Sequence, residues 1–210
     1  MVKTNKCYIF GGYTDEFEPK ITEKIKETDF VICADKGLVS ALKFNIKPNL
    51  VIGDFDSFSG EVPKNFEKIV LPIAKDDTDL HFSAKTAVKK GYRDFILSGV
   101  TGGRLDMTFA TVSTMLYLFN NGCKISVLDK SSHLYITNSR LTLIKPEKNC
   151  TVSVFPIERV EEFSITGGKY PANNLTLDLD FPIGVSNGFD DEKIEISLKK
   201  GILLVIVNFK

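Results

Sequence analysis

Short apolar runs alternate with amphipathic segments through the first part of the chain. The runs have the length of buried strands and cover residues 7–10, 30–34, 50–52, 69–73, 94–100 and 125–129. Between them, helical segments are predicted over residues 18–27, 38–44, 80–90 and 107–120. Strands that alternate with helices in this way predict an α/β fold, with a mostly parallel sheet and helices on both of its faces.

The pattern changes near residue 133. From there on we find no convincing helical period, and short β-rich runs cover residues 134–137, 141–145, 151–157, 160–166, 175–179, 193–198 and 202–209. Several of these runs alternate apolar and polar residues, as strands with one buried face do, and glycine-containing turns separate them. We therefore predict a small antiparallel β-sandwich and two domains, which comprise residues 1–132 and 133–210.

The composition argues against several classes of protein. Lysine and arginine together number 27, and so do aspartate and glutamate, so the net charge gives no reason to expect nucleic-acid binding. The four cysteines are scattered without CxxC spacing, which favours a reduced, cytoplasmic protein over a disulfide framework. The N-terminus shows no signal peptide, and no apolar stretch is long enough to span a membrane.

Two carboxylates follow the buried run at residues 50–52, in the segment Gly53-Asp54-Phe55-Asp56-Ser57. In open α/β sheets, ligands collect at the carboxyl ends of the strands. Neighbouring carboxylates repel each other unless a cation lies between them or one of them has a shifted pKa. The alternative is a solvated turn, since aspartate and serine are ordinary turn residues.

Three further polar loops are predicted at the same edge of the sheet. Asp35 follows the second strand, residues 75–79 precede a helix, and residues 101–106 join a strand to an apolar helix. Helix capping would explain some of these aspartates. Together, however, carboxylates that face a loop of glycines and an arginine suit Mg²⁺ and phosphate groups. This pattern predicts a Mg²⁺-dependent enzyme that acts on phosphorylated nucleotides.

Several segments together resemble the thiamine pyrophosphokinase family. They are Ala34-Asp35-Lys36-Gly37, residues 48–57, Lys75-Asp76-Asp77-Thr78-Asp79, residues 99–106, Gly168-Lys169-Tyr170-Pro171 and Gly184-Val185-Ser186-Asn187. The resemblance covers nearly the whole chain, in order and at fitting spacings. It implies an α/β catalytic domain that binds ATP and Mg²⁺, followed by a β-sandwich that binds thiamine and forms a homodimer. The implied reaction transfers the terminal pyrophosphoryl unit of ATP to the hydroxyl group of thiamine and releases AMP.

The same resemblance implies a role for individual residues. The expected Mg²⁺ ligands are Asp54, Asp56 and Asp79. The expected nucleotide-binding residues are Asp35, Lys75, Asp76, Thr101, Gly102, Gly103 and Arg104. Ser186 and Asn187 would approach thiamine, in a site shared with the partner subunit. Asp79 and Asp106 are the candidates for the base that takes the proton of the hydroxyl group.

The chain departs from the family's pattern at two positions. Lys36 stands where the family usually has a glycine, and Met107 stands where it usually has a histidine. Lys36 adds a positive charge beside the expected phosphate site, while Met107 removes a polar contact. The chain has no tryptophan, so Tyr170 and Phe189 are the candidates for stacking on thiamine.

Three other functions remain open on the residues alone. The Asp-x-Asp pair is also consistent with a metal-dependent glycosyltransferase that uses a sugar nucleotide. A module that senses nucleotide or thiamine without catalysis would need an incomplete set of carboxylates. A purely structural dimer would leave the carboxylates at the strand ends unexplained.

Overall fold

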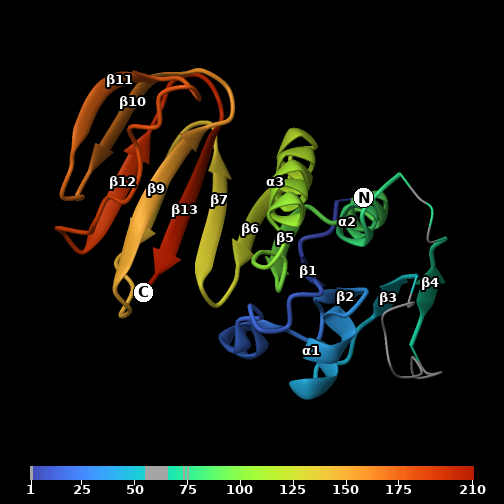
Figure 1. The fold of residues 1–210 in the computed structure, drawn as a ribbon. Coiled ribbons are helices and arrows are strands. Elements are labelled where there is room, and N and C mark those ends of the chain that lie inside the picture. The colour runs from blue at the N-terminus through green and yellow to red at the C-terminus, as the bar shows by residue number, and fades with distance from the viewer. Residues whose placement is uncertain (1, 55–65, 73, 75) are drawn as a thin grey trace. The chain divides into compact units, whose positions relative to one another are not determined.

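The computed structural model describes residues 2–54, 66–72, 74 and 76–210 of the chain (Figure 1). The chain divides into two compact units, Met1–Lys130 and Ser131–Lys210. The sequence predicted domains of residues 1–132 and 133–210. Because Asp56 and Lys75 lie outside the described residues, the predictions for these two side chains stay predictions.

The first unit contains parallel strands in the order β4-β3-β2-β1-β5-β6. Their bounds are β1 (Lys6–Phe10), β2 (Phe30–Ala34), β3 (Leu50–Gly53), β4 (Lys68–Val70), β5 (Asp94–Ser98) and β6 (Lys124–Leu128). Four of them, β1, β2, β3 and β5, are buried along nearly their whole length, as expected for a sheet that is covered on both faces. The predicted parallel sheet is confirmed.

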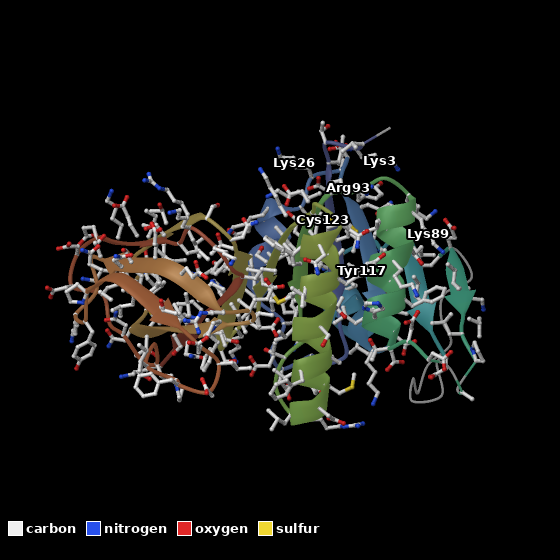
Figure 2. All side chains as sticks on the ribbon, turned by 90° about the horizontal axis from the view of Figure 1, so that it is seen from above. Lys3, Lys26, Lys89, Arg93, Tyr117 and Cys123 are labelled. Atoms are coloured by element: carbon white, nitrogen blue, oxygen red, sulfur yellow. The ribbon has the colours of Figure 1, made fainter. Side chains whose placement is uncertain are left out.

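Helices cover both faces of this sheet. Figure 1 shows α1 (Gly37–Lys43) on one side of the strands and α2 (Asp79–Lys89) and α3 (Leu105–Asn120) on the other. Alternate side chains of the strands, such as Tyr8 and Phe10 of β1, form a core with Leu38 of α1. On α3, Tyr117 (labelled in Figure 2) packs edge-to-face against His81 of α2, with the ring centroids 4.9 Å apart. His81 thus takes part in the packing of α2 against α3.

The first predicted helix takes a different form. Residues Pro19–Lys24 form a short 3-10 helix, η1, where we expected a surface α-helix over residues 18–27. Glu18 accepts a hydrogen bond from the backbone N–H of Lys20 at 3.0 Å and so caps the first turn. The helix was predicted from the spacing of Ile21 and Ile25, but the backbone of Ile25 is already extended, so the helical segment ends before it.

The second unit is a sandwich of two antiparallel sheets. One sheet pairs β13 (Leu203–Phe209) with β7 (Ser132–Thr137) and β9 (Cys150–Pro156). The other has the order β11-β10-β12-β8, with bounds β8 (Arg140–Ile144), β10 (Val160–Thr166), β11 (Ala172–Leu177) and β12 (Lys193–Ser197). Their inward side chains form one core, which includes Val154 of β9, Phe163 of β10 and Val205 of β13. The predicted β-sandwich is confirmed.

The alternation of residues explains this packing. In β12, Ile194 and Ile196 are buried, whereas Lys193 and Glu195 are exposed and form an ion pair of 2.9 Å. Successive side chains of a strand point to opposite faces, so this sequence buries one face of the sheet and leaves the other in water. Among the described helices of the chain, none has both the length and the apolar character to cross a bilayer.

Candidate functional site

A cavity of about 310 Å³ lies in the first unit, at the carboxyl ends of its parallel strands. Loops after β1, β2 and β5 and the first turns of α2 and α3 form its walls. Two carboxylates, of Asp35 and Asp79, and two cationic side chains, of Lys36 and Arg104, line it. The sequence predicted that the loops bearing these residues would meet at one edge of the sheet, and the described residues among them do.

Asp35 occupies a constrained position directly after β2. Its φ angle is +47°, in the left-handed region that non-glycine residues rarely adopt, and its N–H donates a hydrogen bond of 2.7 Å to the carbonyl oxygen of Ile52. A Cβ at Gly53 of β3 would lie 3.1 Å from the Cα of Asp35, which is tighter than most such contacts, so a larger residue there would press the two backbones slightly apart. Since Asp54 follows Gly53 directly, the strand end that carries it is packed against Asp35. The side chain of Asp54 is half-buried.

Asp79 is the first residue of α2, and its position is fixed by the cap of that helix. Thr78 accepts a hydrogen bond of 3.1 Å from the backbone N–H of His81. Asp76 precedes the helix and is exposed, so it does not share a helical face with Asp79. Between them, Asp77 forms an ion pair of 2.8 Å with Lys85, which lowers the pKa of the Asp77 carboxyl group.

The loop after β5 is organised by a carboxylate that sequence reasoning missed. Asp129 is fully buried and accepts hydrogen bonds from the backbone N–H groups of Gly99 (2.6 Å), Val100 (3.2 Å) and Thr101 (2.7 Å). The hydroxyl group of Thr101 donates to the same carboxylate at 2.6 Å. Thr101, which we expected to bind the nucleotide, therefore donates both its N–H and its hydroxyl group to an internal anion. Asp129 is the last residue of the predicted strand over residues 125–129, and an acidic residue at this strand end was a signal that it belongs to the site, although not of which groups it binds.

The buried carboxylate of Asp129 predicts a pH dependence of stability. Burial raises its pKa from 3.8 to about 6, although the hydrogen bonds from the loop act in the opposite direction. Because the folded-state pKa lies above the unfolded one, the stability that Asp129 contributes is complete below about pH 3.8 and is lost as the pH rises through about 6. Within this window, the free energy of unfolding of the wild type should fall, relative to that of Asp129→Asn, by roughly 1.4 kcal/mol per pH unit.

Urea unfolding of the wild type and of Asp129→Asn between about pH 4 and about pH 7 measures this effect. Comparison of the two proteins cancels the titration of the other carboxyl groups, which they share. A difference that stays constant over this range would contradict the prediction and would mean that the hydrogen bonds outweigh burial.

Arg104 and Asp106 bind each other. The guanidinium group of Arg104 donates to both carboxylate oxygens of Asp106, at 3.1 and 2.6 Å, and both side chains are exposed. This contact lowers the pKa of Asp106, whose carboxylate also accepts the backbone N–H of Met107 at 2.9 Å. Asp106 is consequently a weak base in this arrangement.

Gly102 and Gly103 lie in the turn between Thr101 and Arg104, and both have positive φ angles. A Cβ at Gly103 would lie 2.6 Å from the Cε1 atom of Tyr13, so a side chain there would displace the tyrosine ring. Tyr13 lines the cavity, and the glycine turn therefore supports one of its walls.

The residues of the cavity have the oxygen ligands that suit Mg²⁺, because the carboxylates of Asp35 and Asp79 face it. No group of three or more histidine, cysteine, aspartate or glutamate residues that could hold a metal ion occurs in the part of the chain that the structure describes. Of the three predicted ligands, the described residues include Asp54 and Asp79.

Ser186 and Asn187 lie in the second unit and differ in their surroundings. Asn187 is buried, and its side-chain amide accepts from the N–H of Tyr170 at 3.0 Å and donates to the carbonyl oxygen of Tyr170 at 2.9 Å. Ser186 is exposed, has a φ angle of +62° and donates its N–H to the Ser153 hydroxyl group at 3.0 Å. Ser186 lines a cavity of about 490 Å³ together with Tyr170 and Phe189. Asn187 thus positions Tyr170, while Ser186 faces the open space beside it.

Two family models match the chain, one in each unit. Residues 21–127 match the model described as thiamin pyrophosphokinase, catalytic domain, and residues 139–203 match the model described as thiamin pyrophosphokinase, vitamin B1 binding domain. The chain is 30% identical over 205 residues to the thiamine pyrophosphokinase of Bacillus subtilis (strain 168), an alignment that covers 94% of this chain and 96% of that protein.

Solved structures show the same similarity. The crystal structure of thiamine pyrophosphokinase from Bacillus subtilis has a TM-score of 0.88 and 27% sequence identity, and the match covers 98% of this chain and 100% of that one. The thiamin pyrophosphokinase of Geobacillus thermodenitrificans has a TM-score of 0.82 and 28% identity, with 98% of each chain covered.

Proposed function

Because the chain belongs to the thiamin pyrophosphokinase family, we propose that it transfers the terminal pyrophosphoryl group of ATP to the hydroxyl group of thiamine and releases AMP. The observation that carries this proposal is the match to both family models, over residues 21–127 and 139–203. The family predicted from the sequence is confirmed. The match does not favour the alternatives, a glycosyltransferase or a sensor without catalysis.

The cavity of the first unit is the proposed nucleotide site. In this proposal Asp54, Asp56 and Asp79 hold Mg²⁺, which, when bound, neutralises negative charge on the transferring group. The proposed nucleotide-binding residues are Asp35, Lys75, Asp76, Thr101, Gly102, Gly103 and Arg104. Support comes from Asp35, Asp79 and Arg104, which line one cavity. Transfer of this kind depends mainly on positioning and on electrostatic stabilisation of the transferred group.

Asp79 is the better candidate for the base that accepts the proton of the thiamine hydroxyl group. It lines the cavity at the start of α2. Asp106 was the other candidate, but Arg104 binds both of its carboxylate oxygens and lowers its pKa. A carboxylate that is stabilised in this way has little tendency to take a proton.

We also propose that residues 1–132 form the catalytic domain and that residues 133–210 bind thiamine and form a homodimer with a shared active site. Ser186 would contact thiamine directly, whereas Asn187 would act through Tyr170, whose backbone it holds. Tyr170 is 71% exposed and available for stacking. A cytoplasmic location is consistent with four cysteines that are all free thiols.

A coupled assay of AMP release tests the proposed reaction. With ATP and Mg²⁺ present, the protein should form AMP when thiamine is added and form little in its absence. A parallel incubation with UDP-glucose or GDP-mannose should give no hydrolysis. AMP release that does not depend on thiamine, or hydrolysis of the sugar nucleotides, would overturn the proposal.

A further inference from the structure

The cavity of the first unit is lined by a lysine, Lys36, to which the proposed function has not yet given a role. Lys36 lines it beside Asp35, and its side chain is exposed. The other cation of the cavity, Arg104, is bound by both carboxylate oxygens of Asp106. For Lys36, in contrast, the structure shows no ion pair with any residue of the ranges that it describes. Of the two described cations that line the cavity, Lys36 is therefore the one whose charge is available to a ligand.

The backbone at Lys36 is fixed although its side chain is exposed. Asp35, directly before it, is held by a hydrogen bond of 2.7 Å from its N–H to the carbonyl oxygen of Ile52. Helix α1 begins directly after it, at Gly37. A Cβ at Gly12 would lie 3.6 Å from the Cβ of Lys36, so the stem of the lysine starts against the glycine turn that forms another wall of the cavity. This anchoring leaves the ammonium group free to move at the end of its four-carbon stem.

The two carboxylates of the cavity repel an anionic ligand, so a strongly anionic ligand can bind beside them only if cations are present as well. Asp35 and Asp79 are both acidic, and a nucleotide triphosphate adds several negative charges that a single divalent ion does not fully neutralise. Lysine supplies a compact point charge with three donors, which suits phosphate oxygens in several orientations. Since Arg104 would first have to leave Asp106, Lys36 can meet the phosphate groups without breaking an existing contact.

We propose that the ammonium group of Lys36 binds the phosphate groups of the nucleotide donor in this cavity and so sets the affinity for that donor. This inference rests on the proposed function, which supplies the nucleotide. It assigns to Lys36 the binding of the donor and not of the acceptor. Lys75, the other lysine expected at this site, lies outside the described residues.

Steady-state kinetics of Lys36→Met, Lys36→Arg and Lys43→Met tests the proposal. Lys43 is the matched control because it lies at the end of α1, the helix that Lys36 precedes, does not line the cavity, and has its Nζ 5.6 Å from the centroid of the Phe44 ring. We expect Lys36→Met to raise the KM for ATP about 10-fold or more, which is the effect of losing one charge-assisted contact. The KM for thiamine should stay within about 2-fold of the wild-type value, because the substitution removes a contact to the donor and none to the acceptor.

Two further readouts separate donor binding from a structural role. Lys36→Arg should keep most of the affinity for ATP, and Lys36→Met should show a weaker dependence of the KM for ATP on ionic strength than the wild type. Lys43→Met should resemble the wild type in both. An unchanged KM for ATP in Lys36→Met, or equal increases in Lys36→Met and Lys43→Met, would overturn the inference.

The failure of the inference can be told apart from the failure of the proposed function. If the wild type releases no thiamine-dependent AMP, the proposed reaction is wrong, and calorimetric titration with MgATP then tests Lys36 alone. Weaker binding of MgATP by Lys36→Met than by Lys43→Met would support the inference in that case. Equal binding by the two variants would overturn it.

Discussion

Replacing Asp54 by asparagine is expected to lower kcat/KM for AMP formation at least about 100-fold, the scale of removing one group that stabilises the transferred charge. Asp54 follows Gly53 at the end of β3, and the close approach of Gly53 to Asp35 holds this strand end beside the cavity. Asparagine preserves the size of the side chain but removes the negative charge that a Mg²⁺ ligand needs. The measurement is the rate of AMP release at several Mg²⁺ concentrations.

Asp180→Asn provides the matched control for this experiment. Asp180 is an exposed aspartate of the second unit, so the same chemical change there should leave the rate unaltered. The far-ultraviolet circular dichroism and the thermal midpoint of both variants should match those of the wild type. A wild-type rate in Asp54→Asn, with the same dependence on Mg²⁺, would remove Asp54 from the metal site.

The largest expected loss of stability comes from Asp129→Ala. This change leaves three buried N–H groups and the hydroxyl group of Thr101 without the acceptor that they share. Each buried donor that loses its partner costs about 1–3 kcal/mol, although water entering the space can offset part of the total. We therefore expect the free energy of unfolding to fall by at least about 3 kcal/mol, as measured by urea denaturation.

Thr101→Val calibrates this prediction because it removes a single one of the four hydrogen bonds and keeps the shape of the side chain. It should cost about 1 kcal/mol. A fall of less than about 1 kcal/mol in Asp129→Ala would mean that the loop does not depend on the carboxylate. The exposed Asp180→Asn should change stability by no more than about 0.5 kcal/mol.

The architecture could be predicted because the hydrophobic pattern changes its period along the chain. Continuous apolar runs, such as residues 30–34, indicated strands buried on both faces, and the alternation in residues 193–198 indicated a sheet with one exposed face. Because the strands were predicted to be parallel, the loops that carry Asp35, Asp79 and Arg104 were expected to meet at the edge of the sheet where the carboxyl ends of the strands lie. The family came from motifs at these same loops.

The features that sequence reasoning missed depend on which groups meet in the folded structure and not on the local sequence pattern. Nothing in the local sequence of Asp129 shows that it accepts hydrogen bonds from residues about thirty positions earlier in the chain. The pairing of Arg104 with Asp106 depends on the extended backbone of Arg104 just before α3. This backbone brings together two side chains that are two positions apart in the sequence. Likewise, the amide of Asn187 is used by Tyr170, a contact between two turns whose meeting only the folded sandwich determines.

The left-handed backbone of Asp35 has a consequence for how the chain can evolve. A non-glycine residue in that conformation adds strain on the order of 1 kcal/mol to the folded state, whereas glycine adopts the conformation without this strain. Substitution by glycine would therefore relieve this backbone strain while removing a carboxylate from the cavity. Selection for stability alone would push this position toward glycine, so an acidic side chain persists there only as long as its chemistry is needed. Variants of the chain selected for heat resistance in the absence of substrate should lose Asp35 early.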